Sequence, residues 1–117
     1  MSIRNRRAGH NYERQLAEEY RELGYIDCTT SRYSSRKKDD FGIDLDCTIP
    51  FCVQAKYYKN QPNFSQVLDD MRVLSDEIKL VHFKRNKGKG QKKDELVILK
   101  KEDWYTIVQW LKEAKIV

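Results

Sequence analysis

The sequence predicts an α/β fold in which a central mixed five-stranded sheet is flanked by helices. Apolar residues recur at helical spacing near both ends of the chain and once in the middle, and apolar and polar residues alternate in the segments between them. The predicted order is helix, three strands, helix, two strands, helix, without an internal repeat or a linker. At 117 residues the chain is long enough for one domain, which we expect to span residues 1–117.

The first half of the chain predicts one helix and three strands. Apolar residues recur at three- and four-residue steps over residues 6–23, and Gly24 can end that helix. Residues 25–30 predict a short strand, and the polar, basic stretch after it predicts a loop. Apolar and polar side chains alternate over residues 41–48 and again over 51–58, so these segments predict two strands joined by a turn that contains a proline.

The second half predicts a helix, two strands and a last helix. Asn63 and Gln66 have the spacing of a capping box, and the apolar stripe after them carries a helix to about Leu74. Residues 78–84 and 95–100 predict strands, separated by a lysine-rich stretch that we expect to be exposed. The last helix is predicted by an apolar stripe at i, i+3, i+4 and i+7, formed by Trp104, Ile107, Val108 and Leu111.

Composition narrows the partners and the compartment. The net charge is +5, a balance that favours polyanionic partners. The three cysteines lack the paired spacing of zinc sites, so the sequence supports neither a disulfide framework nor structural zinc, and it suits a reducing cytosol. No apolar run approaches the ~20 residues of a membrane span, and the first residues lack the apolar segment of a signal peptide. We therefore expect a cytoplasmic protein without membrane contact.

One polar face of the predicted strand pair suits a metal ion. If the turn lies near Ile49, Asp44 lies about opposite Gln54, with the two Cβ atoms on the order of 5 Å apart. Their oxygens suit Mg²⁺, which takes one or two protein carboxylates and keeps several waters, and the Ala55 carbonyl could supply another oxygen. Lys56 would project beside such an ion, where its ammonium could position an attacking water or help to deprotonate it.

Glu13 adds a further element to this hypothesis. It falls on the apolar stripe of the first helix that should face the sheet, where a lone carboxylate is costly, so it needs a cation, a metal ion or an edge position. Two simpler interpretations stay open. The strand face could be a solvated surface with a cross-strand ion pair, and Glu13 could pair with Arg6 or Arg7 of its own helix.

These positions resemble the PD-(D/E)XK nuclease superfamily. The resemblance consists of the element order αβββαβ and of four positions, which are Glu13 early in the first helix, Asp44 on one strand, and Gln54 and Lys56 on the next. Within the superfamily the chain is most similar to small Holliday junction resolvases of the archaeal and phage type, over residues 5–83. The resemblance implies a restriction-endonuclease-like fold, here in the order αβββαββα, a divalent metal ion, dimers, and hydrolysis of phosphodiester bonds in DNA.

The resemblance also implies a role for each residue of the site. Asp44 would be the central metal ligand, and Gln54 and the Ala55 carbonyl would complete the protein ligands. Lys56 would act on the water, and Glu13 would bind or orient a second metal ion or a water. Mg²⁺ is the expected cofactor, with Mn²⁺ as the alternative.

Two positions depart from the family pattern. Ile43 stands where the name-giving proline would be, and Gln54 replaces the usual acid. The loss of that negative charge weakens metal affinity or shifts the preferred ion, although a glutamine oxygen can still act as a ligand. Asp46 or Asp40 could compensate for it.

Basic and hydroxyl side chains near the predicted site are candidates for contacts with DNA phosphates. The candidates are Arg6, Arg7, His10, Arg32, Ser34, Ser35, Arg36, Lys37, Lys38 and Lys59. A second basic stretch follows over residues 84–93. Neither an aromatic platform for single strands nor a major-groove helix module is evident, so we expect recognition of the shape of the DNA backbone.

The main hypothesis is a magnesium-dependent endonuclease that acts on four-way or other branched DNA as a homodimer. One alternative is a nicking or repair nuclease that acts on other duplex DNA. Another is a non-catalytic nucleic-acid-binding protein with the same fold, which Gln54 makes credible, and a third is an interaction module without nucleic acid. A dimer would match the two-fold-related strands of a junction, with the third strand, the second helix or the last helix as its interface.

Overall fold

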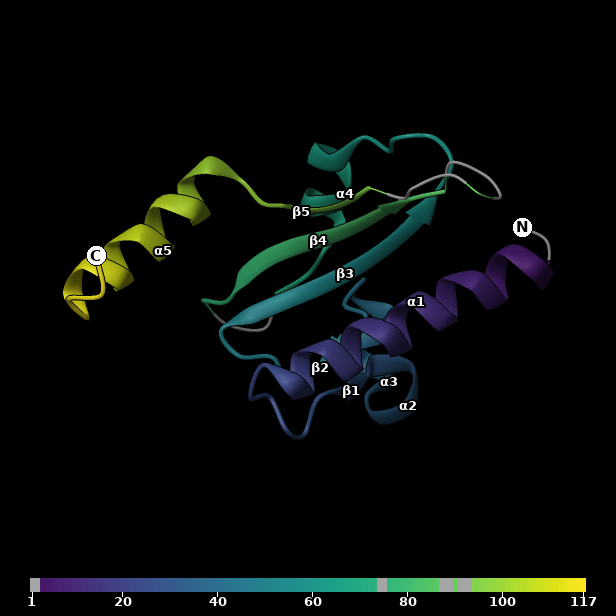
Figure 1. The fold of residues 1–117 in the computed structure, drawn as a ribbon, viewed down its shortest axis with the longest axis horizontal. Helices are drawn as coiled ribbons and strands as arrows, with labels where there is room; N and C mark the ends of the chain where they lie inside the picture. Colours follow the sequence, from purple (N-terminus) through teal and green to yellow (C-terminus); the bar gives the residue numbers. More distant parts are fainter. Residues whose placement is uncertain (1–2, 74–75, 87–89, 91–93) are drawn as a thin grey trace.

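The chain folds into two sheets, with helices on both faces of the larger sheet (Figure 1). The computed structural model describes residues 3–73, 76–86, 90 and 94–117, and residues 3–5 by their backbone alone. The helices are α1 (Ile3–Glu22), α2 (Ser31–Ser34), α3 (Arg36–Asp40), α4 (Phe64–Asp70) and α5 (Lys101–Glu113). The strands are β1 (Thr29–Thr30), β2 (Leu45–Asp46), β3 (Phe51–Tyr58), β4 (Ile78–Arg85) and β5 (Glu95–Ile98). The predicted mixed α/β class is confirmed.

The larger sheet has three strands in the order β3-β4-β5. β3 and β4 are parallel, with Phe51 beside Ile78, and β4 and β5 are antiparallel, with Val81 beside Ile98. β1 and β2 form a separate antiparallel pair. The described residues therefore form two sheets where the sequence predicts a single sheet of five strands.

The sequence predicts that a strand begins at residue 41, but in the structure this stretch forms the end of α3 and the turn after it. Gly42, at φ +77°, is the left-handed residue after α3, and the Ile43 N–H donates to the Lys38 carbonyl at 2.9 Å, as in a Schellman motif. Of the strand predicted over residues 41–48, only the two residues of β2 therefore have strand structure. A backbone hydrogen bond still joins the segment before β2 to the free edge of β3, where the Asp44 N–H donates to the Val53 carbonyl at 2.7 Å.

Two short helices, α2 and α3, occupy the stretch that the sequence predicts as a loop. Ser35 caps α3, because its hydroxyl accepts a hydrogen bond from the Lys38 N–H at 3.3 Å. Helices of four and five residues are too short for apolar periodicity to indicate them. By contrast α1 ends as predicted, with Gly24 at φ +115° and the Tyr25 N–H bonded to the Tyr20 carbonyl at 3.0 Å.

An apolar core lies on each face of the larger sheet. On one face Leu16 of α1 packs with Val53 of β3, and on the other Leu68 of α4 packs with Val81 of β4. Burial of such a side chain contributes about 1.5–3 kcal/mol, so these contacts hold both helices on the sheet. Glu13 lies one turn before Leu16, and the packing of α1 therefore places it against β3.

α4 begins at the predicted cap, where the Asn63 side chain accepts a hydrogen bond from the Gln66 N–H at 3.2 Å, and ends at Asp70, before the predicted end. Predicted residues that lie outside the described part of the chain are Leu74 and Lys87, Lys89, Lys92 and Lys93 of the second basic stretch. Among the described helices, none has both the length and the apolar character needed to cross a membrane.

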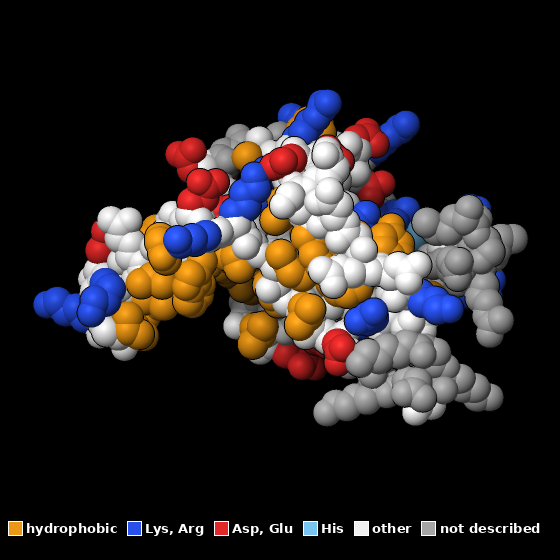
Figure 2. Space-filling view, turned by 90° about the horizontal axis from the view of Figure 1, so that it is seen from above, with side chains coloured by type: hydrophobic (Ala, Val, Ile, Leu, Met, Phe, Trp, Pro, Cys, Tyr) orange, Lys and Arg blue, Asp and Glu red, His pale blue; other side chains and the backbone are white. Residues whose placement is uncertain are grey.

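α5 extends away from both sheets as an arm at the left of Figure 1. It has no buried residue, and Trp104, Tyr105 and Trp110 are exposed on it. Figure 2 shows apolar side chains gathered over this arm. The helix predicted around residues 104–111 is thus confirmed, but its apolar stripe does not reach the core of the sheets as fully as the stripe of α1 does.

Candidate active site

A pocket of about 790 Å³ lies between α1 and the free edge of β3. It is lined by all five residues that the sequence predicts as catalytic or metal-binding, Glu13, Asp44, Gln54, Ala55 and Lys56. They come from α1, from the segment before β2, and from β3. The fold therefore brings the whole predicted site into one place.

Three hydrogen bonds hold Asp44 in this pocket. Its N–H donates to the Val53 carbonyl at 2.7 Å, and its Oδ2 accepts from the Ala55 N–H at 2.7 Å. Its carbonyl accepts from the Ser31 N–H at 2.8 Å. The first two bonds lie on either side of Gln54, so Asp44 lies beside Gln54 as predicted. The carboxylate is preset in one position by its neighbours.

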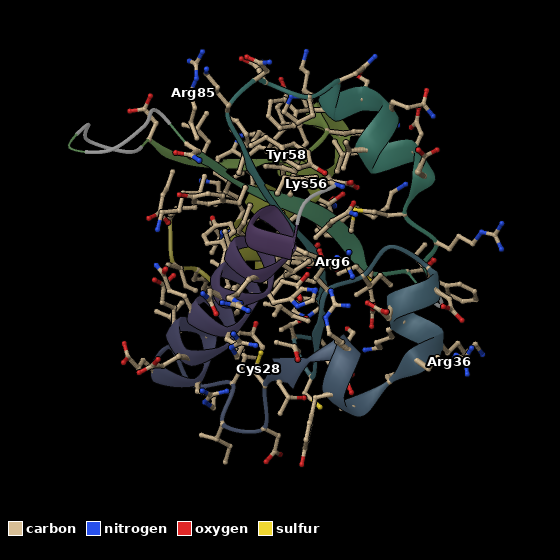
Figure 3. All side chains as sticks on the ribbon, turned by 90° about the vertical axis from the view of Figure 1, so that its right-hand side faces the viewer. Arg6, Cys28, Arg36, Lys56, Tyr58 and Arg85 are labelled. Carbon is tan, nitrogen blue, oxygen red and sulfur yellow. The ribbon has the colours of Figure 1, made fainter. Side chains whose placement is uncertain are left out.

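Backbone groups of β3 point from the edge of this strand toward Asp44. The Val53 carbonyl and the Ala55 N–H both point to this edge. Because the N–H and C=O of one strand residue point to the same side, the Ala55 carbonyl points there too. Lys56 is half-buried, and its Nζ lies 5.5 Å from the centre of the Tyr58 ring (Figure 3).

Glu13 is buried and paired with an arginine from another element. The residue is only 8% exposed, and Arg32 Nη2 of α2 lies 3.3 Å from both of its carboxylate oxygens. Among the described side chains its ion pair is therefore with Arg32, and not with Arg6 or Arg7 of its own helix. The predicted need of Glu13 for a cation is met by this guanidinium.

Burial raises the pKa of both acids, and the charge of Glu13 adds to the rise for Asp44. Burial raises the pKa of Asp44 from its ordinary 3.8 to about 7, and the nearby Glu13 carboxylate adds to the rise, while the Ala55 N–H and Lys56 act against it. Burial also raises the pKa of Glu13, and Arg32 opposes that rise. Two carboxylates that repel each other in a largely buried place form a site that an additional cation stabilises.

The donor atoms of the pocket suit a hard divalent cation. The described residues contain no group of three or more His, Cys, Asp and Glu side chains that could hold a metal ion. The pocket is lined instead by the two acids and by two residues with neutral oxygens, Gln54 and Ala55. Mg²⁺ binds through one or two carboxylates and otherwise through neutral oxygens and water, so the residues present fit it.

Comparisons with protein-family models, with curated proteins and with solved structures find no match to this chain. The pocket and the charges around it are therefore the features of the molecule that bear on its function.

The predicted DNA-binding residues divide into three groups. Those that line the pocket are Arg6, His10, Arg32 and Lys59. Exposed residues outside the lining are Arg7, Arg36 and Lys37. The side chains of Ser34, Ser35 and Lys38 bind other groups of the protein. In Figure 3, Arg6 and Lys56 lie around the start of α1, whereas Arg36 points outward from α3.

Sequence reasoning missed part of the pocket lining. Tyr58 at the end of β3 and Asn86 just after β4 both line it. Tyr58 follows Lys56 by two residues and so lies on the same face of the strand, which is a signal that alternation alone could have supplied. Asn86 carried no such signal, because its place depends on the parallel pairing of β3 with β4.

Asp46 does not join the pocket, although the sequence places it on the same strand face as Asp44. Its carboxylate pairs with the Lys38 ammonium at 2.8 Å and accepts from the Ser34 hydroxyl at 2.9 Å. These bonds hold Asp46 against α2 and α3, so it does not replace the acid that Gln54 lacks. Asp40 is exposed at the end of α3 and is not part of the lining either.

Replacement of Lys38 by alanine tests this division. We expect the free energy of unfolding to fall by about 1 kcal/mol, because a partly buried charge pair is lost. Urea titration measures this loss, and an unchanged free energy of unfolding would contradict the pairing of Lys38 with Asp46.

Proposed function

We propose that this protein is a metal-dependent endodeoxyribonuclease that hydrolyses phosphodiester bonds in branched DNA, as a Holliday junction resolvase does. The observation that carries the proposal is the shared pocket of Glu13, Asp44, Gln54 and Lys56. These are the four positions at which the sequence resembles the PD-(D/E)XK superfamily. A restriction-endonuclease-like fold is part of the proposal, with β1 and β2 as an extension of the larger sheet beyond β3.

The residues of the pocket divide the proposed reaction among them. The two carboxylates and the two neutral oxygens would hold a Mg²⁺ or Mn²⁺ ion, which would supply positive charge beside the scissile phosphate and acidify a nearby water. The Lys56 ammonium would orient the attacking water and offset the negative charge that develops on the phosphate. Asp44 is already fixed by hydrogen bonds, so it would hold the metal ion without first having to reorganise.

The rim of the pocket supports a nucleic-acid substrate. Arg6, His10, Arg32 and Lys59 line the same pocket as the two acids. A site that binds only an anion would not be expected to contain two carboxylates. Carboxylates that hold a cation, beside basic side chains, suit a phosphate that contacts both the cation and the basic rim. The net charge of +5 would add attraction to any polyanion, so it cannot by itself distinguish one DNA from another.

A cleavage assay with two substrates tests the proposal. The purified protein is incubated with a four-way junction and with a linear duplex of the same arm sequence, at one salt concentration, in Mg²⁺, in Mn²⁺ and in EDTA. We expect the junction to be cut in either metal and not in EDTA. Preferential cutting of the linear duplex would favour the nicking or repair nuclease, and no cutting of either DNA would contradict the nuclease assignment.

A non-catalytic nucleic-acid-binding protein is the second candidate, and Gln54 is the residue that favours it. The pocket has two acids where a third would strengthen the hold on a dication. Gln54→Glu is expected to bind Mg²⁺ about tenfold more tightly, because the number of charged ligands tunes the affinity of such sites. Calorimetric titration measures this effect, with Gln61→Glu, outside the pocket lining, as the matched control. Cleavage by Gln54→Glu but not by the wild type would establish the second candidate.

The proposal includes a homodimer, because paired cuts in a junction need two sites. Of the three elements that could form its interface by sequence, α5 has the most exposed apolar surface. Trp104, Tyr105 and Trp110 are exposed on a helix that extends away from the rest of the chain. A standard interface buries roughly 800 Å² on each partner, and a two-fold contact of two such arms would bury their aromatic side chains against each other.

A further inference from the structure

The ion pair between Glu13 and Arg32 joins an inaccessible anion to an accessible cation. Glu13 is 8% exposed, whereas the side chain of Arg32 is 47% exposed. One guanidinium nitrogen, Nη2, lies 3.3 Å from both carboxylate oxygens, so it is shared between them. A carboxylate in such a place needs a positive partner, so the exposed guanidinium can return to water only when another cation takes its place.

The guanidinium lies against the Glu13 carboxylate, which is one of the two acids that the proposed metal ion would use. Arg32 lines the pocket together with Glu13 and Asp44, and it is the ion-pair partner of Glu13 there. The two acids are close enough for the charge of Glu13 to affect Asp44. An arginine and a dication would therefore compete for the same oxygens of Glu13, because two cations that bind one carboxylate repel each other.

We propose that Arg32 occupies the cation position of Glu13 in the metal-free protein, and that a divalent cation displaces it toward the mouth of the pocket, where it binds a DNA phosphate. This inference rests on the proposed nuclease function and adds a regulatory step to it. Metal binding then creates part of the DNA-binding surface. By thermodynamic linkage, DNA that binds the released guanidinium strengthens metal binding in return. The pocket would thus bind the metal ion most tightly when the DNA substrate is present.

Two variants separate this exchange from a general effect of positive charge. Arg32→Ala removes the internal competitor, so we expect it to bind Mg²⁺ about tenfold more tightly than the wild type, within the range usual for coupled sites. Arg6→Ala is the matched control, because it removes an arginine from the same pocket that is not the partner of Glu13. Titration calorimetry at pH 8.5 measures both, since protons then compete little with the metal ion for the two carboxylates.

The second readout is DNA affinity, which should change in the opposite direction. Fluorescence anisotropy with a four-way junction is measured in EDTA and in Mg²⁺, with Lys56→Ala as the background so that the DNA stays intact. We expect Mg²⁺ to raise the affinity in that background, and we expect most of this gain to be lost in the double variant Lys56→Ala/Arg32→Ala. A residue that only supports the fold would weaken both metal and DNA binding.

The outcomes distinguish failure of the exchange from failure of the nuclease. Absence of Mg²⁺ binding to the wild type and to Arg32→Ala, with and without DNA, would overturn the proposed nuclease and the exchange with it. Mg²⁺ binding to the wild type, combined with Arg32→Ala binding it no more tightly than Arg6→Ala, would overturn the exchange and leave the nuclease intact. Tighter metal binding together with a lost Mg²⁺-dependent gain in DNA affinity is the result that the exchange requires.

Discussion

Lys56→Ala is expected to lower kcat for junction cleavage by about 10²- to 10⁴-fold, the usual contribution of a positioned acid or base. Lys56 lines the pocket beside Asp44, and its charge lowers the pKa of that acid, so its ammonium lies near the proposed reaction centre. Without it, an attacking water loses a positioning group and the phosphate loses a compensating charge. Single-turnover cleavage with enzyme in excess measures the chemical step directly.

Lys59→Ala is the matched control for this prediction. Lys59 is an exposed lysine that lines the same pocket three residues further along the chain. We place it at the rim, so its loss should raise KM severalfold and leave the single-turnover rate at saturation nearly unchanged, in keeping with the loss of one phosphate contact. If Lys56→Ala cuts the junction as fast as the wild type, Lys56 is not catalytic.

Asp44→Asn is expected to stabilise the metal-free protein at and above neutral pH. The pKa of Asp44 is about 7 in the folded state, above its ordinary 3.8, so ionisation of this group costs the folded state free energy. The cost is absent below about pH 4, grows between pH 4 and 7, and is fully present above that range. The largest gain for the variant is about 4 kcal/mol, and urea titration at pH 4, 7 and 9 in EDTA measures it.

The opposite sign is expected for Asp46→Asn, which serves as the control. Burial acts to raise the pKa of Asp46, but the hydrogen bonds from Lys38 and Ser34 outweigh it, and the net pKa is lowered. Ionised Asp46 therefore stabilises the folded state above the ordinary pKa, and this contribution is lost as the pH falls. A lower free energy of unfolding for Asp44→Asn than for the wild type at pH 9 would show that ionised Asp44 does not destabilise the folded state.

The long elements of the site could be predicted from the sequence because each has its own period. Alternation along β3 indicates that Gln54 and Lys56 share a face, and the helical stripe of α1 indicates that Glu13 turns toward the sheet. The turn near Ile49 then suffices to bring Asp44 beside Gln54. Each of these inferences needs only a few neighbouring residues and one regular element.

Other contacts of the site depend on segments without a period. Arg32 reaches Glu13 across 19 positions through a polar stretch, so nothing local pairs the two residues. Gly42 ends α3 as Gly24 ends α1, but the apolar residues on either side of it also fit the alternation of a strand. The local sequence is compatible both with a helix end at Gly42 and with a strand through it, so only tertiary packing decides between the two.

The hydrogen bond from the Ser31 N–H to the Asp44 carbonyl affects how fast the pocket can change. It fastens the backbone next to Arg32 to the backbone of the acid, so the proposed exchange needs only rotation of one side chain. Exposed side chains rotate within picoseconds to nanoseconds, whereas loops take nanoseconds to microseconds. Arrival of the metal ion would therefore not wait for a rearrangement of the chain, and the duration of one catalytic cycle would be decided by chemistry or by departure of the cut strands.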